Sequence, residues 1–377
     1  MLKKIIRLFS YFFSFVIPVN KRLLIFVSQP DYADNAYAVY LYMIKHSEFN
    51  NLKFCWLLED LSKYKKIIMQ EINFFSCVKR NVLCVKRKSI LGIWISFRAR
   101  YIINTCGLFC FIKYHQKDKR INLWHGMPIK SIWTSDGFPL GDYTIASSIL
   151  FKNLMSKGLK VNLDHVLVIG QPRNDLMFHE NLFFFPFLET KYKSVGIWMP
   201  TFRRTVSNEY TDGSYTTNNI SFIKIPDLLK LNNYLNSINS FLIIKIHPLD
   251  ILQNEKIPNY SNLIILNNKN FESRMLYPLL GKCDYLLTDF SSVAIDFEIL
   301  NRPIGFIIDD YDEYKNTRGL FINDLPGKNI YNYNDLQEFI KEVTNKNYEI
   351  PKYENKFNLY KDSNSTKRLL NYFNNFC

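Results

Sequence analysis

Two histidines lie in short polar motifs that follow apolar runs of the sequence. His125 is part of Trp124-His125-Gly126, and His247 is part of Lys245-Ile246-His247-Pro248. An imidazole titrates near neutral pH, so either histidine could remove the proton from an attacking hydroxyl group. A glycine beside the first of them would let a substrate approach the backbone closely. A histidine at the end of a strand is more often structural than catalytic, so each is a candidate only.

Three cationic side chains occupy similar positions. Lys245, Arg173 in the Gly170–Asp175 motif, and Arg203 in the Pro200–Arg203 motif each come shortly after an apolar run. Together they could neutralise a pyrophosphate and stabilise its departure. This chemistry is phosphoryl or glycosyl transfer from a nucleotide-activated donor. We find no Asp-x-Asp pair where a divalent metal would be needed, so we expect these cations to replace it, with no metal and no cofactor.

Residues 284–303 have the pattern of a buried strand followed at once by a helix. Tyr285–Leu287 is apolar, and we predict the helix over residues 293–300 because the residue before Pro303 is disfavoured in a helix. Ser291 and Ser292 stand at the predicted helix start, where unpaired backbone N–H groups attract anions. The alternative is an ordinary N-cap, for which serine is a good residue in any protein.

The polar motifs each follow a predicted strand. Short apolar runs alternate with helical stretches along the chain, which predicts an α/β fold of parallel layers. Among the predicted strands are residues 99–104, 194–199 and 263–266. Ligands bind at the carboxyl ends of such strands, so we expect the motifs to converge on one cleft. The alternation breaks at residues 183–193, and we predict domains at 21–185 and 186–377, with the last helix able to pack back on the first domain. The motifs lie at residues 124–126, 170–175, 200–203, 245–247, 289–292 and 318–319.

The composition indicates an anionic partner. The chain has 48 basic and 34 acidic residues and a formal charge of +14. Nucleic acid, an acidic membrane surface or a phosphorylated substrate would each fit this charge. We see no zinc-finger, RNA-recognition or phosphate-loop motif, so we expect no nucleic acid. Seven scattered cysteines form no metal pattern and suggest free thiols in the cytoplasm.

The first 20 residues suggest contact with a membrane surface. Lys3, Lys4 and Arg7 precede the apolar and aromatic segment Leu8–Val19. This segment is shorter than the ~20 residues that span a bilayer, and no small-residue cleavage site follows it. We expect an interfacial helix with its cations on anionic lipid. A helix packed on the protein's own core is the alternative that the sequence leaves open.

As an ordered set, these motifs resemble those of the CDP-glycerol glycerophosphotransferase family, the teichoic-acid primases and polymerases of bacterial envelopes. The resemblance covers residues 22–325, and Asp34-Asn35-Ala36 is also similar to a family element. The matching motifs are Trp124-His125-Gly126-Met127-Pro128-Ile129-Lys130, Gly170-Gln171-Pro172-Arg173-Asn174-Asp175, Pro200-Thr201-Phe202-Arg203, Lys245-Ile246-His247-Pro248, Thr288-Asp289-Phe290-Ser291-Ser292 with Asp296, and Arg318-Gly319-Leu320.

The resemblance implies a GT-B fold, in which two Rossmann-like domains hold the donor between them. It implies that a hydroxyl at the end of a lipid-linked or growing envelope polymer attacks the glycerol-bearing phosphorus of CDP-glycerol, or of a similar CDP-alcohol, and releases CMP. It also implies peripheral attachment to the cytoplasmic face of the plasma membrane. The polymer could be teichoic acid, capsule or O-antigen, and the polyol could be glycerol or ribitol.

The resemblance also implies roles for particular residues. His125 would be the base. The pyrophosphate would be held by His247, Lys245, Ser291 and Ser292. Asp296 would contact the cytidine ribose, and the donor site would be lined by Arg173, Thr201 and Arg203. The other substrate contacts would come from Trp124, Gly126, Met127, Pro128, Ile129, Pro200, Ile246, Asp289, Arg318 and Gly319.

Two departures and two alternatives accompany this hypothesis. Met127 replaces a small residue of the family, which affects the shape of the acceptor side, and Phe290 replaces a tyrosine. One alternative is a GT-B glycosyltransferase that uses a nucleotide sugar in capsule or O-antigen synthesis. The other is a non-catalytic basic protein that binds membrane or nucleic acid. Against the second, the polar clusters lie at strand ends and not along one helical face.

Overall fold

The protein is described here by a computed structural model, which covers residues 2–75, 82–129, 137–179, 181–201, 219–220, 222–248, 250, 258–308, 325–352 and 355–373. The chain divides into two compact units, which we describe separately. Unit 1 comprises Met1–Met127, Ile132–Leu176 and Asp362–Cys377, and unit 2 comprises Pro128–Ser131 and Met177–Lys361. The boundary predicted between residues 185 and 186 therefore falls inside unit 2.

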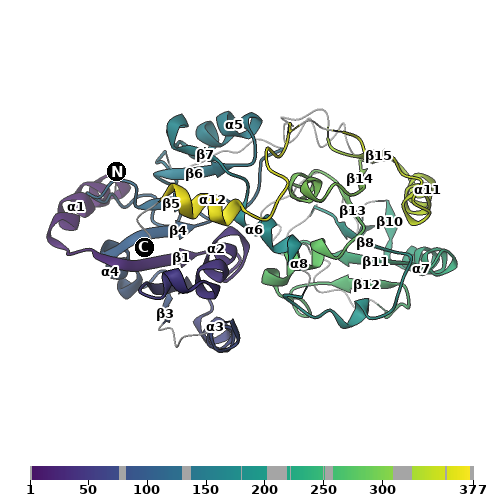
Figure 1. Ribbon diagram of the computed structural model, residues 1–377, viewed down its shortest axis with the longest axis horizontal. Helices are drawn as coiled ribbons and strands as arrows, with labels where there is room; N and C mark the ends of the chain where they lie inside the picture. The colour runs from purple at the N-terminus through teal and green to yellow at the C-terminus, as the bar shows by residue number, and fades with distance from the viewer. Residues whose placement is uncertain are drawn as a thin grey trace. The chain divides into compact units, whose positions relative to one another are not determined.

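Unit 1 is built on a parallel sheet, which has seven strands within the described residues, in the order β3-β2-β1-β4-β5-β6-β7 (Figure 1). The chain order reverses between the neighbours β1 and β4, where Ile25 pairs with Ile102. Such a reversal opens a crevice at the carboxyl ends of the strands. The strands are β1 (Asn20–Val27), β2 (Lys53–Leu58), β3 (Val82–Lys86), β4 (Ala99–Asn104), β5 (Arg120–Asn122), β6 (Tyr143–Ala146) and β7 (Val166–Val168).

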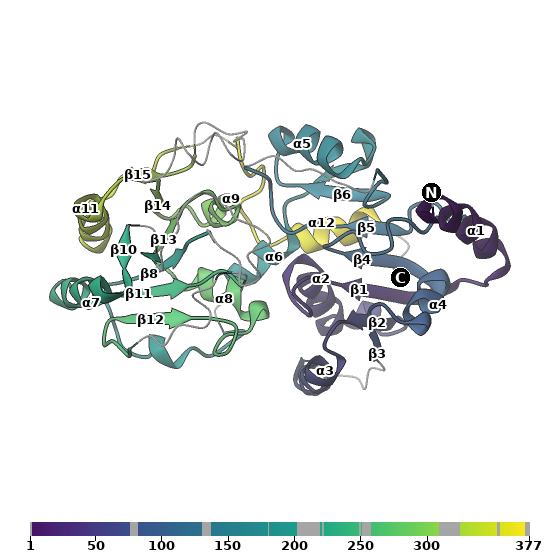
Figure 2. The same ribbon diagram turned by 180° about the vertical axis from the view of Figure 1, so that it is seen from behind.

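The helices of unit 1 connect these strands, and the last one returns from the C-terminus. Helix α12 packs against α6 and α2 (Figure 2). The ring of Phe373 beyond it lies against Tyr101 and Tyr143, with centroid distances of 5.6 and 5.2 Å. The C-terminal segment thus closes one side of the N-terminal sheet. The helices are α1 (Leu2–Val16), α2 (Asp34–Lys45), α3 (Leu61–Phe75), α4 (Ile90–Arg98), α5 (Ile149–Leu159), α6 (Pro172–Asp175) and α12 (Ser365–Tyr372).

Unit 2 has a second parallel sheet, in the order β12-β11-β8-β13-β14-β15 within the described residues. Its inner strands are continuous apolar runs because helices cover both faces. The strands are β8 (Ser194–Met199), β11 (Ser240–Lys245), β12 (Leu263–Leu266), β13 (Tyr285–Thr288), β14 (Ile304–Ile307) and β15 (Lys328–Ile330), beside the small antiparallel pair β9 (Asn219–Ile220) and β10 (Ile223–Lys224).

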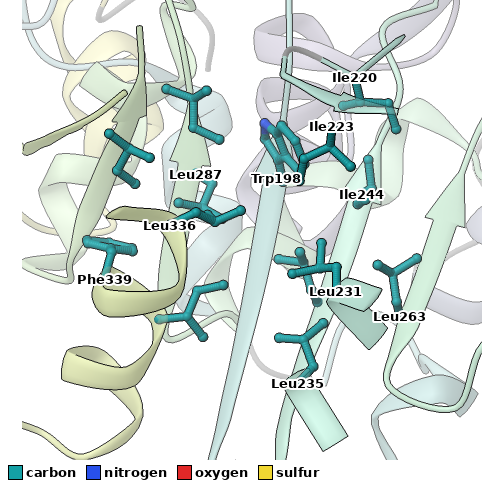
Figure 3. Packing of buried hydrophobic residues seen from close by; sticks show 14 of the residues in the cluster. Trp198, Ile220, Ile223, Leu231, Leu235, Ile244, Leu263, Leu287, Leu336 and Phe339 are labelled. Atoms are coloured by element: carbon teal, nitrogen blue, oxygen red, sulfur yellow. The ribbon is translucent and has the colours of Figure 1, made fainter. Parts of the chain in front are cut away.

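The core of unit 2 forms where two helices meet one face of this sheet. Figure 3 shows Leu231 and Leu235 of α7 (Leu228–Ser237) near Ile244, and Leu336 of α11 (Tyr333–Thr344) near Leu287. All five side chains are fully buried. Burial of each such side chain stabilises the fold by roughly 1.5–3 kcal/mol. The same unit contains α8 (Leu276–Gly281) and α9 (Val293–Phe297).

The parallel α/β architecture predicted from the sequence is confirmed. Strands β4, β8 and β12 occupy the predicted residues, and helix α9 begins at Val293 as expected, continuing as a 3₁₀ turn to Leu300. Helix α5 and strand β15 were not predicted. The cysteines for which the structure gives a bonding state form no disulfide, as expected: Cys55, Cys84, Cys106, Cys110 and Cys283.

Candidate active site

The loop that carries His125 follows strand β5 and has an unusual backbone. Trp124 has a φ of 52° and Gly126 a φ of 137°, a region that side chains rarely occupy. The side-chain oxygen of Asn122 accepts a hydrogen bond from the N–H of Trp124 at 2.9 Å. The Trp124 ring packs against His125, with centroids 4.0 Å apart. These contacts turn the imidazole outward from the end of the sheet, and glycine at 126 makes the turn possible.

One ring nitrogen of His125 is occupied, and the other is available for chemistry. Nδ1 lies 3.2 Å from the carbonyl oxygen of Thr105, just beyond β4. A carbonyl can only accept, so Nδ1 carries the hydrogen and Nε2 of the neutral ring carries the lone pair. The ring has an exposed surface, yet the surrounding protein desolvates it and lowers its pKa. Asp34 acts to raise that pKa and Arg173 to lower it. The neutral form needed by a base is therefore favoured at neutral pH.

A buried asparagine ties the His125 loop to a distant motif. Nδ2 of Asn35, at the start of α2, donates to the carbonyls of Leu123 and Trp124, each at 3.1 Å. Its Oδ1 accepts from the N–H of Arg173 at 3.0 Å. Asn35 is completely buried. Asn35 belongs to the Asp34-Asn35-Ala36 motif, for which the sequence predicted no role. The one sequence feature that could have pointed to it is its position in a polar, turn-rich segment directly after the first strand.

Arg173 lies in unit 1, where it forms an ion pair with Asp34. Its Nη1 is 3.0 Å from Oδ1 of that carboxylate, and both side chains are largely buried. Asp34 has a φ of 62° and uses the same oxygen to accept from the N–H of Asn35. The pair places opposite charges near His125. The predicted contact of Arg173 with the donor stays a prediction.

Two other residues of the 170–175 motif have structural roles. Gly170 has a φ of +88°, and a Cβ atom there would lie 2.5 Å from Oγ of Ser365. Asp175 accepts from the N–H groups of Ser365 and Thr366 at 2.9 and 2.7 Å, so it caps helix α12. Burial raises the pKa of Asp175 to about 6, although these hydrogen bonds oppose the rise. This part of the motif therefore fastens the C-terminal helix to unit 1.

In unit 2, Lys245 is a buried cation at the end of strand β11. Lys245 is 7 % exposed, and its Nζ donates to the carbonyl of Ile246 at 2.8 Å. Desolvation lowers its pKa to about 8, and no carboxylate among the described residues contributes to offset this. A buried ammonium without a counter-charge is costly in the free enzyme and binds an anionic ligand strongly.

A carboxylate fixes the loop after strand β8. Asp289 accepts from the backbone N–H of Thr201 at 3.0 Å and from its hydroxyl at 2.7 Å. The hydroxyl of Thr288 in turn donates to the carbonyl of Met199 at 2.7 Å. The ends of the adjacent strands β8 and β13 are thereby locked together. Two of the predicted substrate contacts, Thr201 and Asp289, thus touch each other.

The ordinary N-cap, which the sequence left open as the alternative, is not formed by Ser292. Ser292 occupies the cap position in a helical conformation, and its side chain makes no capping bond. The hydroxyl of Ser291 accepts a long bond of 3.4 Å from the N–H of Val293. Both serines are half-buried. Asp296 is completely buried and accepts from the hydroxyl of Tyr277 at 2.8 Å, which positions α9 on α8; its ribose contact stays a prediction.

The remaining predicted site residues differ in how far their side chains are exposed to solvent. The side chains of Met127, Pro128, Ile129 and Ile246 are buried, so any contact with substrate would have to come from their backbone. Sδ of Met127 accepts from the N–H of Ser147 at 3.4 Å. His247 and Pro200 are half-buried at the ends of β11 and β8. Outside the described residues lie Arg203, Arg318 and Gly319.

The sequence agrees with one protein family over nearly its whole length. Residues 9–375 match the family described as CDP-glycerol:poly(glycerophosphate) glycerophosphotransferase. The chain belongs to this family. The expected enzyme class, a CDP-glycerol glycerophosphotransferase-like transferase, is confirmed, and it is favoured over the nucleotide-sugar glycosyltransferase and the non-catalytic alternatives.

Individual relatives agree with this assignment. The chain is 30% identical over 240 residues to the teichoic acid glycerol-phosphate primase of Bacillus subtilis (strain 168), a match that spans 62% of this chain and 58% of the primase. It is 25% identical over 357 residues to the teichoic acid glycerol-phosphate transferase of Staphylococcus aureus (strain NCTC 8325 / PS 47), covering 86% of this chain and 84% of that protein.

The fold is shared with a solved structure. The wall teichoic acid polymerase TagF superposes with a TM-score of 0.72 at 21% identity, covering 99% of this chain and 93% of that one. The expected GT-B-like fold is confirmed. Among the described helices, none is long and apolar enough to cross a bilayer.

Proposed function

We propose that this protein transfers glycerol phosphate, or a related polyol phosphate, from a CDP-activated donor to a hydroxyl of a lipid-linked or growing cell-envelope polymer. The observation that carries the proposal is the state of His125. Its Nδ1–H is bound to the carbonyl of Thr105, and its pKa is lowered, so Nε2 is ready to accept a proton. The acceptor oxygen forms a bond to the glycerol-bearing phosphorus as its proton passes to Nε2.

The donor residues of this proposal lie in unit 2. The bond from the attacked phosphorus to the oxygen bridging it to CMP breaks, and CMP leaves with the electron pair. The buried ammonium of Lys245 offsets the charge on the departing phosphate, and among the described residues no carboxylate opposes the desolvation that lowers its pKa. Thr201, held by Asp289, and the half-buried serines 291 and 292 complete the donor contacts.

The proposal includes attachment to an anionic membrane surface through helix α1, on the cytoplasmic side. Its outward face carries Phe9, Phe12 and Val16, which are 70, 62 and 75 % exposed. Its inward face is held by hydroxyl groups: Ser10 accepts from the N–H of residue 113 at 3.0 Å, and Ser14 from that of residue 115 at 2.8 Å. A helix that docks through serines and exposes phenylalanines suits the lipid interface.

The test is CMP release by the purified full-length protein. We expect CMP from CDP-glycerol only when a lipid-linked glycerol-phosphate acceptor is added. CDP-ribitol and a panel of nucleotide sugars identify the donor in parallel reactions. Release of a nucleoside diphosphate from a nucleotide sugar, with none from any CDP-alcohol, would overturn the proposal in favour of glycosyl transfer.

A further inference from the structure

A large cavity lies in unit 1 at the carboxyl ends of four strands. It has a volume of about 1060 Å³. Its walls are the segments that directly follow β1, β2, β3 and β4, so it includes the crevice where the strand order reverses. The segments are residues 29–31, 59–64, 86–88 and 106–111, and Lys3 of α1 completes the lining.

Two of the three carboxylates that line this cavity, those of Asp31 and Asp60, are already engaged within the protein. Asp31 pairs with Arg87 and accepts from the N–H groups of Glu59 and Asp60 at 2.7 and 2.8 Å. Asp60 accepts from the hydroxyl of Ser62 and the N–H of residue 63 at the start of α3, and these bonds lower its pKa. Their charge is therefore largely compensated by nearby donors.

The cations of the cavity outnumber the acids that remain. Lys63, Lys86 and Lys88 are exposed along its rim. Nζ of Lys86 donates to the carbonyl of Glu59, which holds its ammonium beside the opening. With Asp31 and Asp60 engaged, the exposed Glu59 is the one remaining acid of the lining, and the three ammonium groups give the cavity a net positive field that favours an anionic ligand.

A buried arginine fixes the wall of the cavity between β1 and β3. Arg87 is 6 % exposed, and its Nη2 donates to Asp31 and to the carbonyl of Ser28. Its charge is therefore used within the wall, and the cations that face the opening are the exposed lysines.

The cavity and the catalytic histidine share a segment of chain. Thr105, whose carbonyl holds His125, immediately precedes the wall residue Cys106. The hydroxyl of Thr105 also accepts from the N–H of Gln29, another wall residue, at 3.3 Å. An anionic chain in the cavity would thus extend alongside the residues that position the base.

We propose that this cavity binds the phosphodiester chain of the acceptor, a few units behind its reacting hydroxyl. The inference rests on the proposed function and adds the site that holds the acceptor. Phosphate oxygens pair with the exposed ammonium groups of Lys63 and Lys88, while the glycerol carbons lie against Phe109 and Leu108 in the wall. The cavity is larger than one phosphate needs, and the residues proposed for the nucleotide lie in unit 2.

The experiment measures binding of a synthetic glycerol-phosphate trimer to the full-length protein by calorimetry, without donor. The test protein is the Lys63→Gln/Lys88→Gln double variant, because both side chains are exposed and their replacement should leave the fold intact, which circular dichroism checks. We expect its affinity for the trimer to fall about tenfold or more, with CDP-glycerol affinity unchanged. The matched control is Lys157→Gln, an exposed lysine of α5 outside the cavity, which should bind like wild type.

Any of four results would overturn the inference. Equal trimer affinity in the double variant and wild type, or no trimer binding by wild type, would do so. A selective loss of binding to phosphatidylglycerol vesicles would assign the cavity to lipid headgroups. Full competition by inorganic phosphate at the trimer's own concentration would likewise exclude a chain-binding site. Failure of the proposed function is distinguishable, because it would appear as absent CMP release in a protein that still binds the trimer.

Discussion

The backbone N–H of Arg173 donates a hydrogen bond to Oδ1 of Asn35 at 3.0 Å, although 138 residues separate them in the chain. The amide nitrogen of the same asparagine holds the carbonyls of Leu123 and Trp124. One buried side chain therefore connects the start of α2, the loop of the base and the 170–175 motif. The geometry of His125 depends on this connection.

Replacing this asparagine should reduce both stability and turnover. Asn35→Ala leaves two carbonyls and one N–H unpaired in the interior, and we expect a loss of about 1–3 kcal/mol in the free energy of unfolding. We also expect a lower kcat, because the His125 loop loses its support. Urea unfolding and CMP-release assays measure the two effects. Asn153→Ala, on the exposed face of α5, is the control, and equal behaviour of the two variants would contradict the role of Asn35.

Removing the base should nearly abolish transfer and leave the fold intact. General-base catalysis contributes about 100- to 10,000-fold, so His125→Ala should lower kcat by that factor. The control is His46→Ala, since Nδ1 of His46 also contacts a backbone carbonyl, that of Tyr42 at 2.7 Å. Circular dichroism checks the fold of both variants. Turnover near wild type in the His125 variant would refute the assignment.

The pH dependence of transfer should reveal the lowered pKa of His125. The base works only when neutral, so kcat/KM should fall as the pH drops through a value below 6.5, the ordinary value for histidine. The negative charge of Asp34 raises this pKa, so Asp34→Asn should move the acid limb to still lower pH. Profiles of both proteins test this. An acid limb that stays in place, or moves to higher pH, would contradict the electrostatic coupling.

Lys245 should lower the free energy of unfolding and strengthen binding of the donor. Its pKa of about 8 lies below its ordinary 10.5, a difference worth about 3 kcal/mol against the charged form at neutral pH. We expect Lys245→Met to raise the free energy of unfolding by roughly 1–3 kcal/mol at pH 7 and to weaken CDP-glycerol binding. Lys269→Met, at an exposed position of unit 2, is the control and should change neither.

The lowered pKa of Lys245 also predicts that its contribution to the free energy of unfolding depends on pH. Between pH 8 and 10.5 the unfolded chain retains the Lys245 proton that the folded chain has lost, so the contribution of Lys245 to stability rises with pH across this window. The difference between wild type and Lys245→Met should therefore shrink from pH 8 upward. A constant difference in chemical unfolding would show that Lys245 is not desolvated.

Helix α1 should control adsorption to vesicles. Phe9→Ser/Phe12→Ser removes two exposed rings but keeps the serines that dock the helix. We expect less protein to sediment with phosphatidylglycerol liposomes, because less apolar surface enters the interface. Phe184→Ser removes an equally exposed ring, 68 % accessible, from unit 2 and serves as control. Unchanged sedimentation of the double variant would exclude α1 as the membrane contact.

The sequence by itself determined the elements and the family. Continuous apolar runs such as 194–199 and 263–266 predicted buried parallel strands at those residues, because the period of side chains along the chain is a local property. Pro303 likewise predicted where the helix that begins at Val293 ends, because a proline disfavours helical backbone in the residue before it. The ordered motifs indicated a glycerophosphotransferase, and the family match agrees.

Only the tertiary structure decided which polar groups meet. Asp175 belongs to a motif that was expected to lie at the cleft, and it caps α12, a helix that begins 190 residues later at Ser365. Ser292 was a candidate N-cap and forms no such bond, because the chain enters α9 already helical. Asn35 and Thr105 set the tautomer and position of His125 through contacts that no local pattern encodes. Hydrogen bonds between distant segments depend on how strands are ordered in the sheet, and that order is settled by packing of the whole unit.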